Sequence, residues 1–464
     1  MRMRAAMFLA VVGIMGAAGA GAQQQDTSAT ASGATAATAA PAAARTITLQ
    51  EAEQLALKNN HVVRLSSLKV DEKQHEKDAA KSYYYPTLKN ESKALHLTEA
   101  EHIVVPAGSF GTVAGTSVPT NPVLIAQGAV NLQISGTELS QPLTPLLKIR
   151  EKNNIAGAEL NASRAESRET RNEVVQRVRA LYYSVLVAQS HRAAIEASIG
   201  AAEALAKERV QQVKYGSALT QDEIESRAQS LQAKQDLITV DLQLSDIAIQ
   251  LNDAIGVPLS TQLTLDPNIR QRPEPCSLEE CKTLATESHP EIQRAQQDVE
   301  KASAAVRLAR REYIPDTEVF ARHSYQNGVS FLEHNFGTFG FVLSYDLFEG
   351  GRRRAELGAR HSQLDQAREN LARVKEEVEV KVQTAYNKME RTRQMMRVSE
   401  EILTLRTESH RVLAQQLREG SALESQVDSA AARELEAKAS LLQVQLDYTQ
   451  AKDEVDVAIG RTPE

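Results

Sequence analysis

Tryptophan is absent from this 464-residue chain, and all aromatic residues together make up only 4% of it. Few aromatic side chains argue against a sheet-rich enzyme core, whereas a composition dominated by Ala, Leu, Gln, Glu, Arg and Val favours long helices. An excess of one charge is also missing, because 24% of the residues are charged but the formal net charge is only −7. The two signs are interspersed, which argues against a nucleic-acid partner, since such a partner requires a basic stripe.

Long hydrophobic runs are missing beyond the N-terminus. No later stretch approaches the roughly 18 apolar residues that indicate a membrane-spanning helix. Residues 1–22 have the pattern of a secretory signal peptide, with Arg2 and Arg4, a short apolar segment, and small residues before a cleavage site after Ala22. An uncleaved membrane anchor is the alternative. Residues 23–45 form an Ala/Thr-rich tract that we expect to be a disordered tether.

Catalytic motifs and cysteines are equally scarce. The ten histidines are scattered, and there is no HExxH, GxSxG or phosphate-binding loop. We therefore predict no catalytic residue, no metal ligand, no cofactor and no enzymatic activity. The two cysteines, Cys276 and Cys281, flank a predicted helix start at 277–280. In an oxidising compartment they would form a short disulfide across the first helical turn, and an unpaired packing role is the alternative.

What the sequence does contain is a tandem repeat. Gly216–Leu219 and Gly420–Leu423 both have the sequence Gly-Ser-Ala-Leu and are 204 residues apart (420 minus 216). The residues around them also match at this offset. Upstream of the strands the offset becomes 229, since Pro86 matches Pro315. The additional 25 residues (229 minus 204) lie in one long connection of the first copy. The chain therefore divides into repeat 1, residues 46–264, and repeat 2, residues 265–464.

Each repeat begins with the same predicted elements. A capping box, Thr48 with Glu51 or Ser277 with Glu280, starts a helix of roughly 35 residues that ends before the proline at 86 or 315. A pair of strands follows, at 86–143 in repeat 1 and 315–348 in repeat 2, with near-alternating apolar and polar positions. In repeat 1 we expect a Gly/Pro/Thr-rich loop to join the two strands.

Each repeat then continues into a predicted helical hairpin. Proline-free patterns run from about 146 to 215 and from about 352 to 419, each long enough to span about 105 Å as a helix. Each ends at a glycine that favours the left-handed conformation, and Thr220 or Ser421 would start the returning helix. The returning helices carry apolar seams at alternating steps of three and four, which bury against another helix: Leu237, Val240, Leu244, Ile247, Leu251 and Ala254; and Leu441, Val444, Tyr448, Ala451, Val455 and Ala458.

This arrangement resembles the TolC-like outer-membrane efflux proteins across essentially everything after Arg45. The resemblance rests on the duplicated order of helix, strand pair and helix pair, on the helix exits at Pro86 and Pro315, on "LSQPL" and "LSYDLFEGG" after the strands, and on the glycine reversals. It implies a mainly α fold with membrane β-structure. Four β-strands per chain would complete a 12-stranded barrel and a helical tunnel as a trimer, because a lipid-exposed sheet edge is not tolerated.

The resemblance also implies a function and partners. The protein would be a passive outer-membrane channel, the exit duct of a tripartite efflux or type I secretion system, extending into the periplasm. Its partners would be two further copies of itself, a periplasmic adaptor and through it an inner-membrane transporter, and outer-membrane lipid. The rival hypothesis is a soluble periplasmic coiled-coil adaptor, which also uses long antiparallel hairpins. The sequence does not predict whether the cargo is a drug, a metal ion or a polypeptide.

Two groups of residues are candidate sites. Glu424 and Asp428 share a helix face and would form two rings of three carboxylates in a trimer, favouring cations at a constriction; a plain solvated face is the alternative. The two reversals would be the tips where an adaptor docks, and simple turns without a partner are the alternative. These tip residues are Gly216, Ser217, Ala218 and Leu219, and Gly420, Ser421, Ala422 and Leu423.

Overall fold

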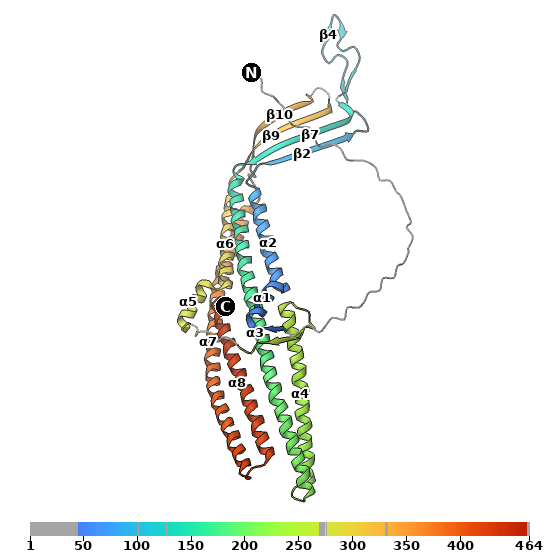
Figure 1. Cartoon of the computed structure of the whole chain (residues 1–464). Helices are drawn as coiled ribbons and strands as arrows, with labels where there is room; N and C mark the ends of the chain where they lie inside the picture. Colours follow the sequence, from blue (N-terminus) through green and yellow to red (C-terminus); the bar gives the residue numbers. More distant parts are fainter. Residues whose placement is uncertain are drawn as a thin grey trace, which may run out of the picture. The chain divides into compact units, whose positions relative to one another are not determined.

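The computed structural model describes residues 45–100, 102–126, 128–268, 274, 276–329 and 333–461, which belong to one compact unit, Ala44–Glu464. The predicted signal peptide and all of the predicted tether except Arg45 lie outside the described residues. Repeat 1 contains helices α1 (Leu49–Asn59), α2 (His61–Ser82), α3 (Pro145–Lys214) and α4 (Thr220–Ile255) (Figure 1). Repeat 2 contains α5 (Leu278–Ser288), α6 (Pro290–Arg311), α7 (Arg352–Arg418) and α8 (Glu424–Ala458).

The long helices and their reversals agree with the sequence analysis. Helix α3 has 70 residues and α7 has 67, and each turns back into a shorter helix, α4 or α8. The predicted apolar seams of α4 and α8 are buried or half-buried along their whole length. The seams bury because α4 packs on α3 and α8 packs on both α3 and α7.

The first helix of each repeat is broken, which the sequence analysis did not predict. Asn60 separates α1 from α2 and His289 separates α5 from α6, both with extended backbone. The Asn60 Oδ1 accepts a hydrogen bond from the Val62 amide (2.8 Å), and the His289 Nδ1 accepts one from the Glu291 amide (3.2 Å). Both side chains thus cap a new helix start. The prediction of one continuous helix of about 35 residues in each repeat is therefore wrong.

The predicted strands form one antiparallel sheet. Strands β2 (Thr87–His96) and β7 (Gly128–Pro142) come from repeat 1, and β9 (Asp316–Val329) and β10 (Asn335–Ser344) come from repeat 2. Their order is β10-β9-β7-β2, so the inner pair β7–β9 joins the two repeats (Figure 1). Strands β2 and β10 are the two edges of this sheet.

Several short strands escaped the sequence analysis. The expected loop between β2 and β7 contains two small antiparallel pairs, β3 (His102–Val105) with β6 (Val123–Ala126) and β4 (Thr112–Val113) with β5 (Thr116–Ser117). Near the helix ends, β1 (Arg45–Ile47) pairs in parallel with β8 (Leu263–Leu265). Strands of two to four residues are too short for a periodicity to indicate them.

The buried core surrounds the helix breaks. In repeat 1 the phenol of Tyr182, which is fully buried, donates to the carbonyl oxygens of Ile47 (3.0 Å) and Asp266 (2.9 Å). It thereby ties the small β1–β8 sheet to α3. In repeat 2 the corresponding cluster lies around Val382 and Ile459.

A glycine at the end of each returning helix packs against a break. Gly256 has φ +70°, and a Cβ there would lie 2.6 Å from the Cβ of Asn59. Gly460 has φ +79°, and a Cβ there would lie 2.7 Å from the Cα of His289. Only glycine combines this backbone conformation with so close an approach. The pair shows that both repeats close on themselves in the same way.

Candidate functional site

The long helices and the four main strands of the compact unit are arranged in three rows of four, with α3 and α7 belonging to both helical rows. The sheet order is β10-β9-β7-β2. In the helical layer next to the sheet, α2 packs on α3, α3 on α6, and α6 on α7; in the layer toward the reversals, α4 packs on α3, α3 on α8, and α8 on α7 (Figure 1). Each row therefore ends in a repeat 1 element on one side (β2, α2 or α4) and a repeat 2 element on the other (β10 or α7).

The helices at the ends of these rows expose apolar seams. On α4, Ile238 is 69% exposed, and on α7, Leu405 is 64% exposed. Most exposed apolar side chains of both helices are separated by three, four or seven residues, the pattern of a coiled-coil seam that has no partner within the described chain; Val380 and Leu417 on α7 lie off this pattern. These side chains are Ile224, Leu231, Ile238, Leu242 and Ile249 on α4, and Met395, Val398, Ile402, Leu405 and Val412 on α7.

The two faces of the sheet differ in polarity at one level of the four paired strands. Leu88, Leu139, Ala321 and Phe339 are successive cross-strand neighbours on one face, and Phe339 is 88% exposed. One residue further along each strand, the opposite face carries Lys89, Glu138, Arg322 and Thr338. The contrast is confined to this level, because the next residues on the apolar side are Asn90, Thr137, His323 and Gly337.

Exposed aromatic and apolar residues cluster where the strands join the helices. Tyr83, Tyr85 and Tyr313 are exposed directly before β2 and β9. Leu347 and Phe348, directly after β10, are each 90% exposed. Such side chains suit the border between a bilayer and water. The sequence analysis noted the phrase that contains Leu347 and Phe348 but gave these two residues no role.

The two reversals have identical backbone geometry. Gly216 has φ +73° and Gly420 has φ +74°. The next amide donates back into the helix in each case, from Ser217 to the Gln212 carbonyl (2.8 Å) and from Ser421 to the Gln416 carbonyl (2.9 Å). This is the Schellman pattern that ends a helix at a left-handed residue. The predicted turns at Gly216–Leu219 (tip 1) and Gly420–Leu423 (tip 2) are therefore present.

The starts of the returning helices differ from the prediction. Leu219 and Leu423 occupy the N-cap positions, so Thr220 is the first helical residue and Ser421 lies inside the turn. Here the third helical residue reaches back, because Asp222 accepts from the Leu219 amide (3.0 Å) and Gln426 from the Leu423 amide (3.1 Å). This half of a capping box needs no hydroxyl at the N-cap.

The tips present apolar surface. Leu219 is 70% and Leu423 is 50% exposed, and Tyr215, which the sequence analysis missed, is 79% exposed. Within the tips Ala218 and Ala422 are half-buried, whereas the other tip residues are exposed. Large exposed apolar side chains beside small residues are typical of a surface that another helix covers.

The two candidate carboxylates lie at the start of α8 in different surroundings. Glu424 is exposed and Asp428 is half-buried, and neither makes an ion pair within the described chain. Between them Ser425 is buried, and its hydroxyl donates to the carboxylate of Glu208 on α3. That hydrogen bond holds the two helical hairpins together close to their tips.

A groove separates the two hairpins just behind the tips. This cavity of about 540 Å³ lies between α3, α4 and α8. About half of its lining residues are Ala or Ser, such as Ala194, Ser198 and Ala432, and the rest include charged residues such as Asp236 and Arg433. The sequence analysis did not find it, because its residues come from three helices far apart in the chain.

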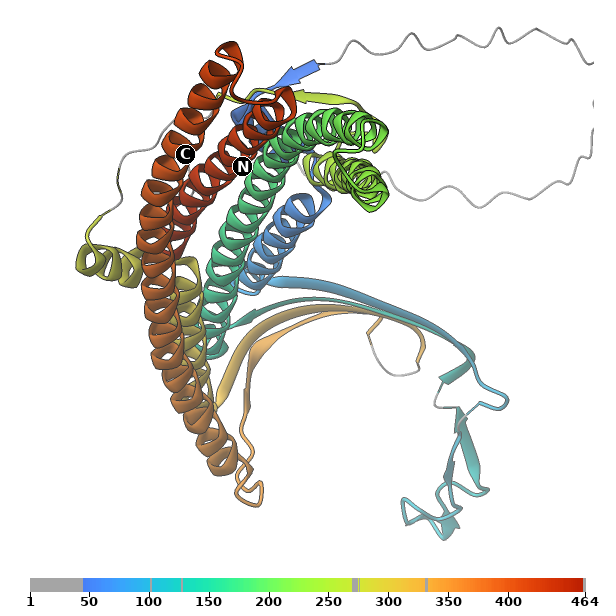
Figure 2. The ribbon, with the colours of Figure 1, turned by 90° about the horizontal axis from the view of Figure 1, so that it is seen from below.

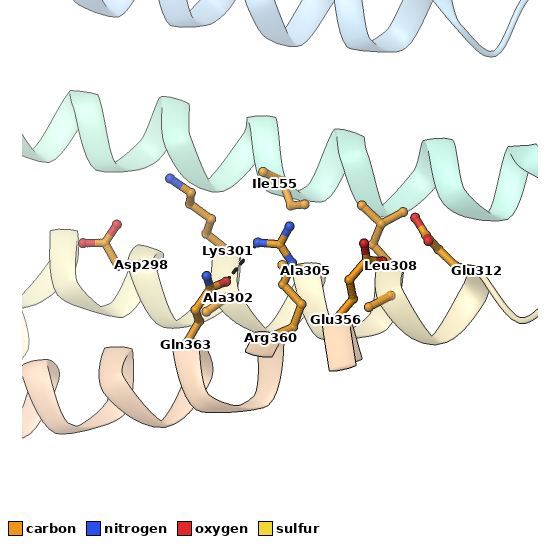
Figure 3. Close-up of a pocket in the computed structure, with 11 residues that line it drawn as sticks. Ile155, Asp298, Lys301, Ala302, Ala305, Leu308, Glu312, Glu356, Arg360 and Gln363 are labelled. Atoms are coloured by element: carbon orange, nitrogen blue, oxygen red, sulfur yellow. Dashed lines mark hydrogen bonds between the residues drawn. The ribbon is translucent and has the colours of Figure 1, made fainter. Parts of the chain in front are cut away.

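A second cavity, of about 350 Å³, lies over α6 between α3 and α7 (Figure 3). Ala302 and Ala305 form part of its lining, and around them the Arg360 guanidinium donates to Gln363 (2.9 Å). In the described residues we find no group of three or more His, Cys, Asp or Glu side chains that could hold a metal ion. We assign no catalytic role to this cavity.

A third cavity, of about 440 Å³, contains a pair of carboxyl groups beside the α5–α6 break. Burial and a hydrogen bond with Glu291 raise the pKa of Glu169 on α3 to about 7. Burial opposes ionisation of Glu291 as well, but the Lys381 ammonium lowers the pKa of Glu291 below its usual value. The pair therefore shares one proton near neutral pH.

The two cysteines are joined by a disulfide, with 5.5 Å between their Cα atoms. The bridge encloses the start of α5, where the Ser277 amide donates to Glu280 (3.0 Å). In repeat 1 the corresponding capping box, Thr48 with Glu51, is closed by hydrogen bonds in both directions.

In the part of the chain that the structure describes, no helix is long and apolar enough to cross a membrane.

Comparison with known proteins agrees with this geometry. Residues 283–461, most of repeat 2, match the family described as outer membrane efflux protein. Among curated proteins, no relative was found. The CmeC outer membrane channel of Campylobacter jejuni has 15% identity and a TM-score of 0.73, over 89% of this chain and 85% of that chain. VceC of Vibrio cholerae has 14% identity and a TM-score of 0.70, over 90% and 97% of the two chains.

A third solved structure, the open state of the MtrE channel of Neisseria gonorrhoeae, has 15% identity and a TM-score of 0.66, over 89% of both chains. The fold is therefore that of a protomer of TolC-like outer-membrane channels. Residues 283–461 match the outer membrane efflux protein family and the whole described chain has the fold of these channels, so the resemblance and the predicted mainly α fold with four sheet strands per chain are confirmed.

Proposed function

We propose that the protein is an outer-membrane channel, the exit duct through which a tripartite efflux or secretion system releases its substrates to the exterior. The observation that carries this proposal is the set of three rows of four elements, each with two unpartnered ends. A single chain cannot close any of these rows. Further copies of the chain close all three at once and enclose a continuous passage.

Closure of the sheet supports a trimer. Neighbouring strands are antiparallel throughout, so β2 of one chain and β10 of the next also run antiparallel. Two chains would give an eight-stranded barrel filled by its own side chains. Three chains give twelve strands, the smallest closed barrel of this kind with room for a channel.

Closure of the helical layers supports the same assembly. The exposed seam of α4 lies at one end of its row and the exposed seam of α7 at the other. Packed against each other in neighbouring chains, they would bury apolar residues such as Ile238 and Leu405. A soluble adaptor, the rival hypothesis, does not explain a four-stranded sheet with two free edges, and no comparison supports it.

We further propose that a periplasmic adaptor docks on tip 1 and tip 2. Support comes from the exposed side chains of Tyr215, Leu219 and Leu423 and from the small-residue groove between the hairpins. Small side chains let a helix of another protein approach closely. In the trimer Asp428 and Glu424 would line the passage near these tips as two carboxylate rings that favour cations.

The decisive experiment is the mass and conductance of the protein extracted by detergent from purified outer membranes. We expect a particle of three chains that conducts ions in a planar bilayer. A monomer in the soluble periplasmic fraction would overturn the channel proposal in favour of the adaptor.

Adaptor docking needs a separate measurement. Leu219→Asp together with Leu423→Asp should abolish co-purification of the adaptor but leave trimer mass and conductance unchanged. The matched control is Ser217→Asp together with Ser421→Asp, which adds the same charges beside the apolar side chains. Loss of binding in both double variants would point to the added charge rather than to an apolar contact.

A further inference from the structure

The connection between β2 and β7 is a folded arm, residues 102–126. Strand β3 pairs with β6 from His102 opposite Ala126 to Val105 opposite Val123. Beyond this pair, the Phe110 amide donates to the Val118 carbonyl (2.9 Å), and the Val118 amide donates to the Gly111 carbonyl (2.8 Å). Because its own backbone hydrogen bonds hold it in shape, the arm has a defined surface.

That surface is apolar and uncharged. Residues 102–126 contain no Asp, Glu, Lys or Arg. Phe110 is 75% exposed, and Val113 and Leu124 are each exposed by about two thirds of their surface. Single exposed apolar residues are ordinary, but a continuous uncharged segment with several of them indicates a surface that is covered in the working protein. The arm accounts for the 25 residues that repeat 1 has in excess of repeat 2.

The position of the arm identifies what covers it. The arm projects from the sheet on the side away from the helices (Figure 1), and it lies on the concave side of the curved sheet (Figure 2). In a closed barrel the concave side faces the lumen, so the arm lies at the mouth and not on the wall that faces lipid. The arm also lacks the cationic side chains that would hold lipid phosphates.

We propose that the three arms of the assembled protein pack against one another over the outer mouth of the barrel and narrow the exit. The partner of each arm is thus the same arm in the two neighbouring copies, which meet around the threefold axis. This inference rests on the proposed trimeric channel. An uncharged, apolar contact fits this partner, because three equal charges placed around one axis would repel one another.

Cross-linking tests the contact directly. Since the two native cysteines are bonded to each other, Phe110→Cys introduces the single free thiol of each chain. Mild oxidation of outer-membrane vesicles should then produce disulfide-linked dimers. Phe339→Cys, at a similarly exposed position on β10 outside the arm, is the matched control and should give none. If Phe110→Cys fails to reach the membrane, Leu124→Cys on β6 provides a second position.

Removal of the arm tests its effect on conduction. Replacing residues 103–125 by a short glycine-rich turn should leave the trimer intact and raise the single-channel conductance. A conducting trimer with no cross-linked dimers at either position, and with unchanged conductance after deletion, would overturn the inference while leaving the channel proposal standing. A wild-type protein that neither trimerises nor conducts would instead overturn the channel itself.

Discussion

At the scale of single residues, one buried arginine joins the two halves of the chain. Arg179 on α3 is 1% exposed, and it donates to the carboxylates of Glu53 on α1 and Asp453 on α8, the latter at 2.8 Å. Two carboxylates around one guanidinium compensate the cost of taking these charges out of water. The cluster therefore links repeat 1 to the end of repeat 2.

Removal of that arginine should be costly. Arg179→Met leaves Asp453 buried without its guanidinium, which lowers the free energy of unfolding by about 3–5 kcal/mol. Denaturant titration of the detergent-solubilised protein, followed by circular dichroism, measures the loss. The control Lys69→Met breaks only the exposed pair with Glu166, worth about 0–1 kcal/mol. Equal losses in the two variants would contradict a stabilising role for the cluster.

The shared proton of Glu169 and Glu291 predicts a pH dependence. The pKa of Glu169 rises from 4.5 to about 7 on folding, so its stabilising contribution is complete below pH 4.5 and is lost as the pH rises to about 7. Glutamine does not ionise, so Glu169→Gln should not lose stability in this way. Relative to the wild type, the melting temperature of the variant should rise between pH 4.5 and about 7 and stay higher above pH 7. Melting temperatures between pH 4.5 and 8 measure the effect.

The matched control for this titration is Glu401→Gln, which makes the same change on the exposed face of α7. The Glu401→Gln curve measures the effect of the substitution itself at each pH. A Glu169→Gln curve that runs parallel to the wild type would contradict the shared proton.

Sequence reasoning reached some of these residues and missed others for a physical reason. The glycines of the tips and the capping boxes act on neighbours a few residues away, so a local pattern is sufficient to find them. Arg179 binds partners 126 and 274 residues distant. Such a contact depends on how the helices pack, and nothing in the local sequence distinguishes Arg179 from an exposed arginine.

At the scale of elements, each repeat is closed by a glycine against a helix break. The Asn60 side-chain amide donates to the Ala254 carbonyl (2.9 Å), and the Ser288 hydroxyl donates to the Ile459 carbonyl (2.8 Å). The end of the last helix of a repeat is therefore bound to the break in its first helix. This contact fixes the hairpin relative to the helices that lead to the sheet.

A side chain at this contact should destabilise the fold. Gly256→Ala places a Cβ against Asn59 on a left-handed backbone, and the backbone alone costs about 1–3 kcal/mol. The control Gly358→Ala lies within α7 with open space around it and should instead stabilise by about 1 kcal/mol. Denaturant unfolding of both variants checks the prediction, and an unchanged stability of Gly256→Ala would contradict the close packing.

The long elements could be predicted from the sequence, whereas their interruptions could not. The 3–4 spacing of α4 and α8 extends over many turns and outweighs local exceptions. The breaks lie in other helices, and each consists of one capping residue, Asn60 or His289, between two helices, which is too short for a periodicity to indicate. The arm was expected to be a loop because Gly and Pro indicate turns, and pairing between short strands has no local signal.

At the scale of the whole molecule, the exposed seams should control assembly. Leu405→Glu introduces a charge into the α7 seam and should shift the detergent-extracted protein from trimer to monomer, as should Leu242→Glu in the α4 seam. The control Gln243→Glu adds the same charge to α4 beside the seam and should leave the trimer intact. Mass photometry or sedimentation distinguishes these outcomes, and trimers in every variant would exclude the α4–α7 contact.

The duplication could be predicted from the sequence, but which strands form the two edges of the sheet could not. Offsets of 204 and 229 residues define which elements correspond, yet they do not say which strands are neighbours. That information comes from the β7–β9 register, which puts β2 and β10 on the outside. Edge and centre strands of one sheet carry similar alternating patterns, so only the pairing itself distinguishes them.

The three rows of four have a consequence for the symmetry of the assembly. Each row has a repeat 1 element at one end and a repeat 2 element at the other. In the proposed assembly, the contact between two subunits would therefore join a repeat 1 to a repeat 2, as the contact between the two repeats of one chain does. Around the proposed ring of three chains the halves would alternate six times, and the boundaries would differ mainly in whether the two halves are covalently linked. The proposed channel would therefore be a quasi-hexamer of half-length units, and because both halves belong to one chain, one half can carry an arm that the other lacks.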